Sequence, residues 1–357
     1  MARCSSRPLH RGARQRGAAI VTALLVVTLA VVIVSGMLWR QQVEIRAVEN
    51  QRLKAQATWI ARAGIDWARL ILRDDLRRTG AVDHLGEIWA VPIQETKLSD
   101  FLGSSLRTDT AGEESYLSGR IFDAQARFNL MNLLTMQTLG TRTIVTGRDK
   151  DGIKAYGQLL QSLNLDPSLA NLTATTLAQM LGGFQSVEGA TGGQSGGGDD
   201  SGGGGSPGNG PRPLDDVDSL LSIPGYTADT VRKLRPYVIV LPTRTQINAN
   251  TASAEVLAAV IPSLSLDRAR ALVQARDRAY FRNIGDVTNQ LRGLAPGADT
   301  SNISNLLDVQ THYFLVYGMA RHERAQLGQV ALVSRGDPVN NNATRIVWVR
   351  RIDGIPS

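Results

Sequence analysis

Hydrophobic residues gather first near the amino terminus, where the run from Ala18 to Leu38 contains no charged side chain. A helix over this run would be about 31 Å long, which matches the hydrocarbon core of a bilayer. Arginines crowd the amino-terminal side of the run, whereas charges of both signs follow it, namely Arg40, Glu44 and Arg46. Because positively charged flanks stay in the cytoplasm, the run predicts one membrane span with the bulk of the chain on the outer side.

Beyond the run, apolar residues recur at three- and four-residue steps, and no proline occurs between Pro8 and Pro92. The recurring positions are Val43, Ala47, Val48, Ala57, Ile60, Ala61, Ala68 and Ile71. This pattern predicts one helix from about Ala18 to about Arg78, about 90 Å long, whose first third is apolar all round. The amphipathic remainder must then dock on a domain. A plain membrane anchor with a long coiled stalk is the simpler alternative.

The net charge is concentrated ahead of the span. Residues 1–17 hold five arginines and no acidic residue, which accounts for most of the net charge of +7. Without them the chain is close to neutral, so composition does not predict a strongly basic surface for nucleic acid. Cys4, the single cysteine, also lies in this segment, which excludes a disulfide framework and a multi-cysteine metal site.

A short basic leader that ends in Arg16-Gly17 and passes directly into an apolar, then amphipathic helix resembles the type IV prepilin class. The resemblance implies that a prepilin peptidase cuts between Gly17 and Ala18 and leaves the helix in the inner membrane. Most members of the class carry a glutamate five residues into the mature chain, but that position is Thr22 here. In the class, the glutamate is thought to offset the buried terminal ammonium of a neighbouring subunit. Its absence is typical of the type II secretion system protein K family and suits a subunit at the end of a fibre.

Two further segments resemble the protein K family. In the first, from Ser115 to Leu134, a strand runs through an acidic residue into an asparagine motif, at Asp123, Phe128, Asn129, Leu130 and Asn132. A plain strand–helix junction capped by Asn129 would give the same pattern, and the two interpretations are compatible. The second segment is INANTASAEVLAAVIP, residues 247–262. Residues 133–181 predict helices with polar loops.

A glycine-rich tract at residues 182–210 predicts a flexible loop, because it cannot bury enough surface to offset its ordering entropy. Two helix–turn–helix units follow at residues 214–242 and 246–287 and resemble helix–hairpin–helix modules, which are often found on DNA. Those modules present glycine-rich hairpins to phosphates, whereas the hairpin IPSLSL of the second unit has no glycine. We therefore expect a solvated face at Arg268, Arg270, Arg276 and Arg278. A membrane-anchored DNA-binding protein is the alternative function, but no nucleic-acid partner is expected.

The carboxyl-terminal part changes character. Three runs rich in β-branched and aromatic residues, at residues 312–323, 327–336 and 344–354, predict an antiparallel meander. A strand near Arg120 and Ile121 is expected to join them. The predicted fold is α+β, with a long amino-terminal helix packed on an antiparallel sheet. This pilin-like domain comprises residues 39–130 and 305–357, and residues 131–304 form an all-α insertion with helix–hairpin–helix-like (SAM-like) units.

Candidate chemistry is sparse. His84, His312 and His322 show no metal-binding spacing, and the last two are expected at the surface. A G-x-S-x-G match around Ser195 lies in the glycine-rich tract, so an anchored hydrolase is not expected. Asp149 and Asp151 form only a fragment of a calcium loop and predict a turn. The resemblance implies that calcium can bind in the insertion, where the nearest acids are Glu188, Asp199, Asp200, Asp215, Asp216 and Asp218.

These patterns predict a non-enzymatic minor pseudopilin that caps the tip of the periplasmic pseudopilus of a type II secretion system. Such systems export folded proteins across the outer membrane. The expected partners are other minor pseudopilins in a tip complex, the major pseudopilin fibre and the prepilin peptidase. We expect a single pass through the inner membrane of a Gram-negative bacterium, with the carboxyl-terminal bulk in the periplasm.

Overall fold

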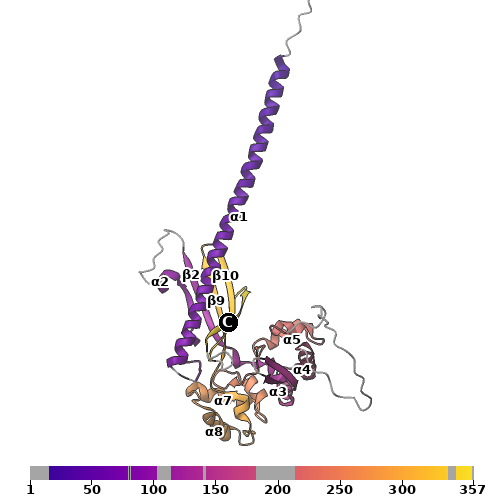
Figure 1. Ribbon diagram of the computed structural model, residues 1–357, viewed down its shortest axis with the longest axis vertical. Coiled ribbons are helices and arrows are strands. Elements are labelled where there is room, and N and C mark those ends of the chain that lie inside the picture. Colours follow the sequence, from indigo (N-terminus) through magenta and orange to yellow (C-terminus); the bar gives the residue numbers. More distant parts are fainter. Residues whose placement is uncertain are drawn as a thin grey trace, which may run out of the picture.

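One continuous helix dominates the computed structural model, which describes residues 16–78, 80, 82–102, 114–139, 142–181, 214–336 and 343–355. Helix α1 runs from Arg16 to Arg78 over 63 residues, which confirms the predicted unbroken helix. Its amino-terminal half extends away from the rest of the molecule, and the large apolar side chains from Ile20 to Val48 are exposed (Figure 1). Within the described residues, α1 is the helix with the length and composition to cross a membrane.

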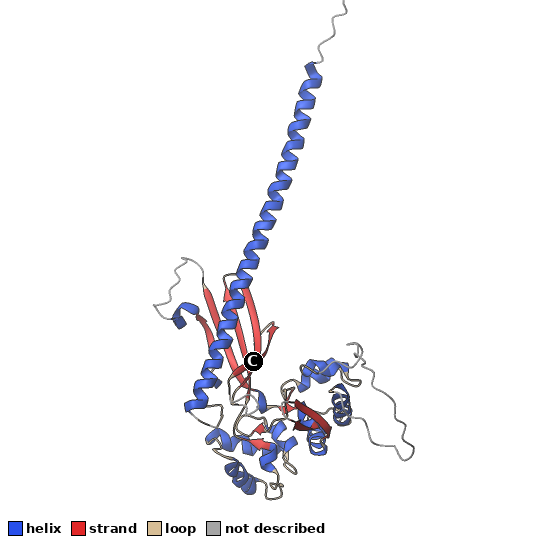
Figure 2. Ribbon diagram, in the orientation of Figure 1, coloured by secondary structure: helices blue, strands red, loops and turns tan. Residues whose placement is uncertain are grey.

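A five-stranded antiparallel sheet lies against the carboxyl-terminal half of α1 (Figure 2). Its strands, in spatial order, are β1 (Ile93–Lys97), β2 (Ser115–Asp123), β9 (Tyr313–His322), β10 (Ala325–Ser334) and β11 (Arg345–Ile352). The meander of β9, β10 and β11 confirms the predicted sheet, as does the pairing of β2 with β9, where Ile121 lies opposite Val316. Because β2 and β9 are neighbours, the chain between them leaves the sheet and returns as an insertion.

The core of the pilin-like domain forms where one face of α1 meets the sheet. Ile65, Ala68 and Leu72 are buried at helical spacing and cluster with Phe314 and Val316 of β9. The opposite face of the sheet carries a second apolar cluster, which includes residues of the insertion and consists of Ala124, Ile239, Leu241, Tyr313, Leu315, Val330 and Leu332. Three short helices flank the sheet, namely η1 (Ile88–Ala90), α2 (Leu98–Leu102) and η3 (Ala124–Ala126).

The insertion forms its own core beyond the sheet. Its helices are α3 (Lys150–Ser162), α4 (Leu169–Met180), α5 (Ala228–Leu234), α6 (Ala254–Val260), α7 (Leu266–Arg278), α8 (Ile284–Leu294) and α9 (Ile303–Leu306), with the 3₁₀ helices η4 (Leu130–Leu133) and η5 (Val217–Ser222). Asp149, Ser253 and Asn283 cap α3, α6 and α8 with their side chains. A single apolar cluster that extends from Phe128 to Val309 joins these elements.

The insertion is not all-α, which corrects the prediction. Strands β4 (Leu134–Leu139) and β5 (Arg142–Arg148) pair antiparallel as a hairpin where helices were predicted. Threonine, isoleucine and valine dominate this hairpin, and their β-branched side chains favour strands. Two short parallel pairs add further strands, namely β3 (Phe128–Asn129) with β6 (Val238–Ile239) and β7 (Ile247–Asn248) with β8 (Leu307–Asp308). The first helix of the unit at residues 214–242 is also only the 3₁₀ helix η5.

Candidate functional site

The predicted processing site lies at the start of α1. Gly17 and Ala18 are in its first turn, and Thr22 follows on an exposed part of the helix. Ile20 and Leu24, on either side of Thr22, are 65% and 61% exposed. This part of α1 needs an apolar environment that the described residues do not supply, because so large an apolar surface is rarely left in water. Cleavage between Gly17 and Ala18 stays a prediction.

A buried polar junction connects the insertion to the sheet. Asp123, at the end of β2, is buried, and its Oδ2 accepts hydrogen bonds from Asn248 Nδ2 at 2.9 Å, Thr251 Oγ1 at 2.5 Å and Thr311 Oγ1 at 2.6 Å. Its Oδ1 accepts from the backbone N–H of Gln125 at 2.7 Å. Burial raises the pKa of Asp123, and these hydrogen bonds oppose the rise. The acidic residue of the predicted motif is therefore the centre of the junction.

Arg335 extends the junction to the end of α1. Its guanidinium is fully buried and binds Asp75 of α1 at 2.7 Å, Asp83 through a second nitrogen, and the carbonyl oxygen of Thr311 at 3.2 Å. The guanidinium also lies 4.6 Å from the ring centroid of Phe314. Burial raises the pKa of Asp83 to about 7, because desolvation outweighs the attraction to Arg335. Sequence reasoning missed Arg335, although a cation directly after an apolar strand was a signal that could have identified it.

Three buried carboxylates near Arg335 could offer ligands to a metal ion. Asp75, Asp83 and Glu87 have oxygens within 4.8 Å of one another. However, Arg335 already provides a cation for the two aspartates. Glu87 Oε2 accepts from the indole N–H of Trp89 at 2.7 Å and from a backbone N–H at 3.0 Å. These partners account for the two aspartates and for Glu87 Oε2, whereas Glu87 Oε1 is buried without a hydrogen-bond partner among the described residues.

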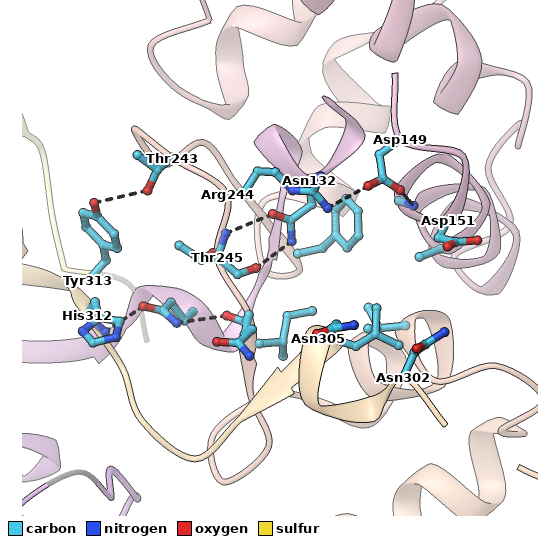
Figure 3. A pocket seen from close by; sticks show the side chains of 18 residues that line it. Asn132, Asp149, Asp151, Thr243, Arg244, Thr245, Asn302, Asn305, His312 and Tyr313 are labelled. Atoms are coloured by element: carbon cyan, nitrogen blue, oxygen red, sulfur yellow. Dashed lines mark hydrogen bonds and ion pairs between the residues drawn. The ribbon is translucent and has the colours of Figure 1, made fainter. Parts of the chain in front are cut away.

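The two asparagines of the motif fasten a distant loop. Asn129 caps η4 through the N–H of Met131 at 3.1 Å, and its amide donates to the carbonyl oxygen of Thr243 at 2.7 Å. Asn132 makes a reciprocal pair with the backbone of Thr245, at 2.8 and 3.1 Å (Figure 3). The expected cap at Asn129 is confirmed, but it begins a 3₁₀ turn instead of an α-helix. The motif is structural, because its side chains satisfy backbone groups.

A polar groove of about 550 Å³ lies beside this loop (Figure 3). On one side, Asp149 caps α3 through the N–H of Gly152 at 2.8 Å and pairs with Arg244 at 2.7 Å. The residues Asp149 to Gly152 therefore begin helix α3 instead of forming the predicted turn. Among the described residues that line the groove there is neither serine nor cysteine, and no nucleophile stands beside a base. The groove offers hydrogen-bonding side chains such as Asn302 and Asn305.

Two of the three described acids predicted for calcium, Asp216 and Asp218, form ion pairs with arginines. Asp216 caps η5 through the N–H of Ser219 at 3.0 Å and binds Arg350 at 2.8 Å. Asp218 binds Arg235 at 2.7 Å. The backbone oxygen of Asp215 accepts from Arg350 at 2.9 Å. This half of the set does not fit a calcium site, and Glu188, Asp199 and Asp200 lie outside the described residues.

Two residues expected at the surface are buried, which corrects those predictions. Arg276 of α7 is 8% exposed, and its guanidinium donates to the carbonyl oxygens of Ala249 and Ala252 at 2.8 and 2.5 Å. These hydrogen bonds hold the segment INANTA (residues 247–252) in place. Arg276 is therefore not part of the solvent-exposed face that was predicted for the four arginines. His322 is 3% exposed, and its Nδ1 lies 2.8 Å from Ser115 Oγ, because it sits opposite Ser115 in the sheet.

Comparison with known proteins now adds to this geometry. Two family models, both described as type II secretion system (T2SS) protein K, match residues 126–243 and 247–310. The chain is 33% identical to type II secretion system protein K of Pseudomonas aeruginosa over 86% of this chain and 84% of that protein. It is 25% identical to the Aeromonas hydrophila protein of the same name, over 96% and 98%.

A solved structure shares the fold. It is a chain in the crystal structure of the GspK–GspI–GspJ complex from the type 2 secretion system of enterotoxigenic Escherichia coli. The TM-score is 0.62 at 22% identity, and the match covers 86% of this chain and 100% of that one. The family matches and the shared fold confirm the resemblance that the leader, Thr22 and the asparagine motif indicated. The chain belongs to the type II secretion system protein K family.

Proposed function

We propose that this chain caps the free tip of the periplasmic pseudopilus and has no catalytic role. The apolar part of α1 holds the subunit in the inner membrane before assembly and then packs among the helices of other subunits. The insertion faces away from the membrane and ends the fibre. In this proposal the chain contributes shape and contacts, not chemistry, to the export of folded proteins.

The position of the insertion carries the proposal. The insertion lies beyond the sheet, at the end of the molecule opposite the free part of α1 (Figure 1). In a fibre whose subunits lie with their helices parallel, a subunit stacked above this one would collide with the insertion. The buried hydrogen bonds from Asn248 and Thr251 of the insertion to Asp123 of β2 favour one orientation of the insertion, so it cannot readily swing aside.

Thr22 agrees with a position at the end of the fibre. A subunit within the fibre needs a carboxylate to offset the terminal ammonium of a neighbour, since an unpaired charge in an apolar bundle is expensive. The uncharged run from Ala18 to Leu38 supplies none. A subunit at the tip lacks that neighbour, so threonine is tolerated there.

The partners we propose are the two minor pseudopilins that correspond to GspI and GspJ. The fold relative from Escherichia coli was crystallised in a complex with those two proteins. The test is co-expression of the full chain with its two counterparts, followed by extraction of the membranes in mild detergent and purification through the chain. We expect both counterparts to copurify, while an unrelated single-span protein does not. If all three are in the membrane and no complex forms, the proposal is wrong.

Processing by the prepilin peptidase gives an independent test. The intact mass of the membrane-extracted chain should correspond to a protein that begins at Ala18, with or without a methyl group on its new terminus. Gly17→Val should leave the leader in place, because the peptidase requires the small residue before the cut. A mature chain that begins beyond Leu38 would contradict retention of the apolar helix.

A further inference from the structure

A hollow in the pilin-like domain lies outside every feature described so far. Its volume is about 280 Å³, and it opens between the carboxyl-terminal part of α1, the η1 segment and strands β2 and β9. The lining is almost entirely apolar and includes Trp67 and Ile71 of α1 and Trp89 of η1. We call it the glycine socket, because Gly119 and Gly318 lie opposite each other in the sheet and line it, together with Gly64 of α1.

The three glycines of the socket differ in how much space surrounds them for a Cβ atom. A Cβ on Gly119 would stand 2.9 Å from the carbonyl oxygen of Tyr317, and one on Gly64 would stand 2.9 Å from Leu117 Cδ1. The close approach of the neighbouring strand's backbone therefore explains why position 119 is glycine, and the close approach of α1 to β2 explains why position 64 is glycine. At Gly318 no heavy atom of the described structure lies within 4 Å of an added Cβ. The chain thus leaves space at Gly318 that its own packing does not need.

The rim of the socket is unusually apolar for a surface exposed to water. Ile88 is 71% exposed, Val91 63% and Trp67 37%, and all three line the socket. Single exposed apolar residues are common, but a hollow rimmed by several of them marks a place where another molecule binds.

Exposed apolar side chains, interspersed with charged ones such as Arg52 and Asp66, continue from the socket along the outer face of α1, and we call this face the stripe. Val48, Trp59 and Leu70 are exposed by 65%, 68% and 47%. Their spacing of about three helical turns places them on one face, roughly opposite the side that Ala61 and Ile65 bury against the sheet. Trp67 lies at the border of the stripe and the socket, so the two form one surface that runs toward the membrane-spanning part of the helix.

We infer that the glycine socket receives a bulky apolar side chain from the amphipathic helix of a neighbouring pilin-like subunit. The inference rests on the proposed function, since that subunit is one of the two partners proposed above. A partner that covers the stripe must lie along α1, as a subunit anchored in the same membrane does. A lipid tail does not fit, because Gly64 is about 39 Å along the helix from the end of the span at Leu38.

The test fills the socket without touching its rim. We expect Gly318→Leu to weaken copurification of one of the two minor pseudopilins by about 10- to 100-fold, the value of one buried apolar side chain. The experiment uses the full chain co-expressed with both partners. Gly293→Leu is the matched control, because Gly293 in α8 also has free space around an added Cβ within the described structure and lies in the insertion.

A second variant keeps the test decisive if Gly318→Leu does not fold. Ile88→Ser removes an exposed rim residue and should weaken the same partner, whereas Leu221→Ser, on the insertion and 49% exposed, should not. Folding of each variant is checked by thermal unfolding. If the unaltered chain binds both partners and both socket variants bind equally well, the inference is overturned and the proposed function stands. If the unaltered chain binds neither partner, the proposed function fails.

The same experiment distinguishes other occupants. Phospholipid that copurifies with the unaltered chain but not with Gly318→Leu, with partner binding unchanged, would overturn the assignment to a subunit. A complex that contains two copies of this chain and that dissociates when Gly318→Leu is introduced would also overturn the assignment to a minor pseudopilin. Loss of one minor pseudopilin alone is the result that supports the inference.

Discussion

Helix α1 and the insertion are both attached to the same five-stranded sheet, but through different chemistry. The contact with α1 is apolar and consists of small and branched side chains such as Ala61, Ile65 and Leu72. The contact with the insertion adds to an apolar cluster a set of buried hydrogen bonds, in which Asn248 and Thr251 of the insertion donate to Asp123 of β2. Arg335 borders this set and binds Asp75 of α1 and Asp83. Apolar packing is non-directional, whereas hydrogen bonds and buried ion pairs hold only one geometry. The difference indicates that the orientation of the insertion is the feature most tightly specified.

Removal of the buried cation should have the largest effect. Arg335→Met leaves Asp75 and Asp83 without their shared partner, so we expect the free energy of unfolding to fall by about 3–5 kcal/mol. Denaturant unfolding of the detergent-extracted chain measures it. Arg324→Met is the matched control, because Arg324 and Glu49 form an exposed ion pair worth less than about 1 kcal/mol. A loss below about 1 kcal/mol for Arg335→Met would show that the buried ion pairs between the sheet, the end of α1 and Asp83 contribute little to stability.

Substitutions in α1 should lower the free energy of unfolding only on the side of the helix that packs against the sheet. Ile65 is 1% exposed, so Ile65→Ala should lower the free energy of unfolding by about 2–5 kcal/mol through the cavity it leaves. Trp59 lies on the outer face and is 68% exposed, and Trp59→Ala should change it by less than about 0.5 kcal/mol. The same denaturation experiment compares the two. Equal losses would mean that α1 does not present a free face.

The polar junction should also make stability depend on pH. The pKa of Asp83 is about 7 in the folded protein, against an ordinary value of 3.8. Between these values the folded state binds the proton and the unfolded state does not, so the free energy of unfolding falls as the pH rises. The slope is up to about 1.4 kcal/mol per pH unit. Unfolding at pH 5 and pH 7 should show a flatter dependence for Asp83→Asn, and an identical slope in both proteins would refute the assignment.

The exposed ion pair between the sheet and the insertion should contribute least to the free energy of unfolding. Arg350 of β11 binds Asp216 of the insertion, but both side chains are partly exposed, at 33% and 45%. Water screens such a pair, so Arg350→Ala should cost less than about 1 kcal/mol in thermal or denaturant unfolding. A cost above about 2 kcal/mol would move the main attachment of the insertion from the buried junction to the edge of the sheet.

The parts of the fold that sequence could predict are those encoded locally. The unbroken helix follows from its apolar periodicity and the lack of proline, and the meander follows from three β-branched runs. The pairing of β4 with β5 was not predicted, because the pattern of residues 133–181 indicates helices with polar loops, although the threonines near its start favour strands. The leader and Thr22 indicated the family, but calcium candidates in the glycine-rich tract lie outside the described residues.

The junction could not be predicted, because its members are brought together only by the fold. Arg335 and its partner Asp75 are 260 residues apart in sequence, and Asp123 and Asn248 are 125 apart. Arg276 and His322 looked like surface residues for the same reason, since their burial depends on distant backbone carbonyls and a neighbouring strand. The glycine socket is also absent from any local pattern, because Gly64, Gly119 and Gly318 meet only in space.

The most direct test of the central claim locates the chain in the fibre. Pseudopili sheared from cells can be labelled with a gold-conjugated antibody against the insertion and viewed by electron microscopy. The account predicts label at one end of each fibre and none along the shaft. Label distributed along the length would contradict it, because an insertion held rigidly beyond the sheet cannot be accommodated between stacked subunits.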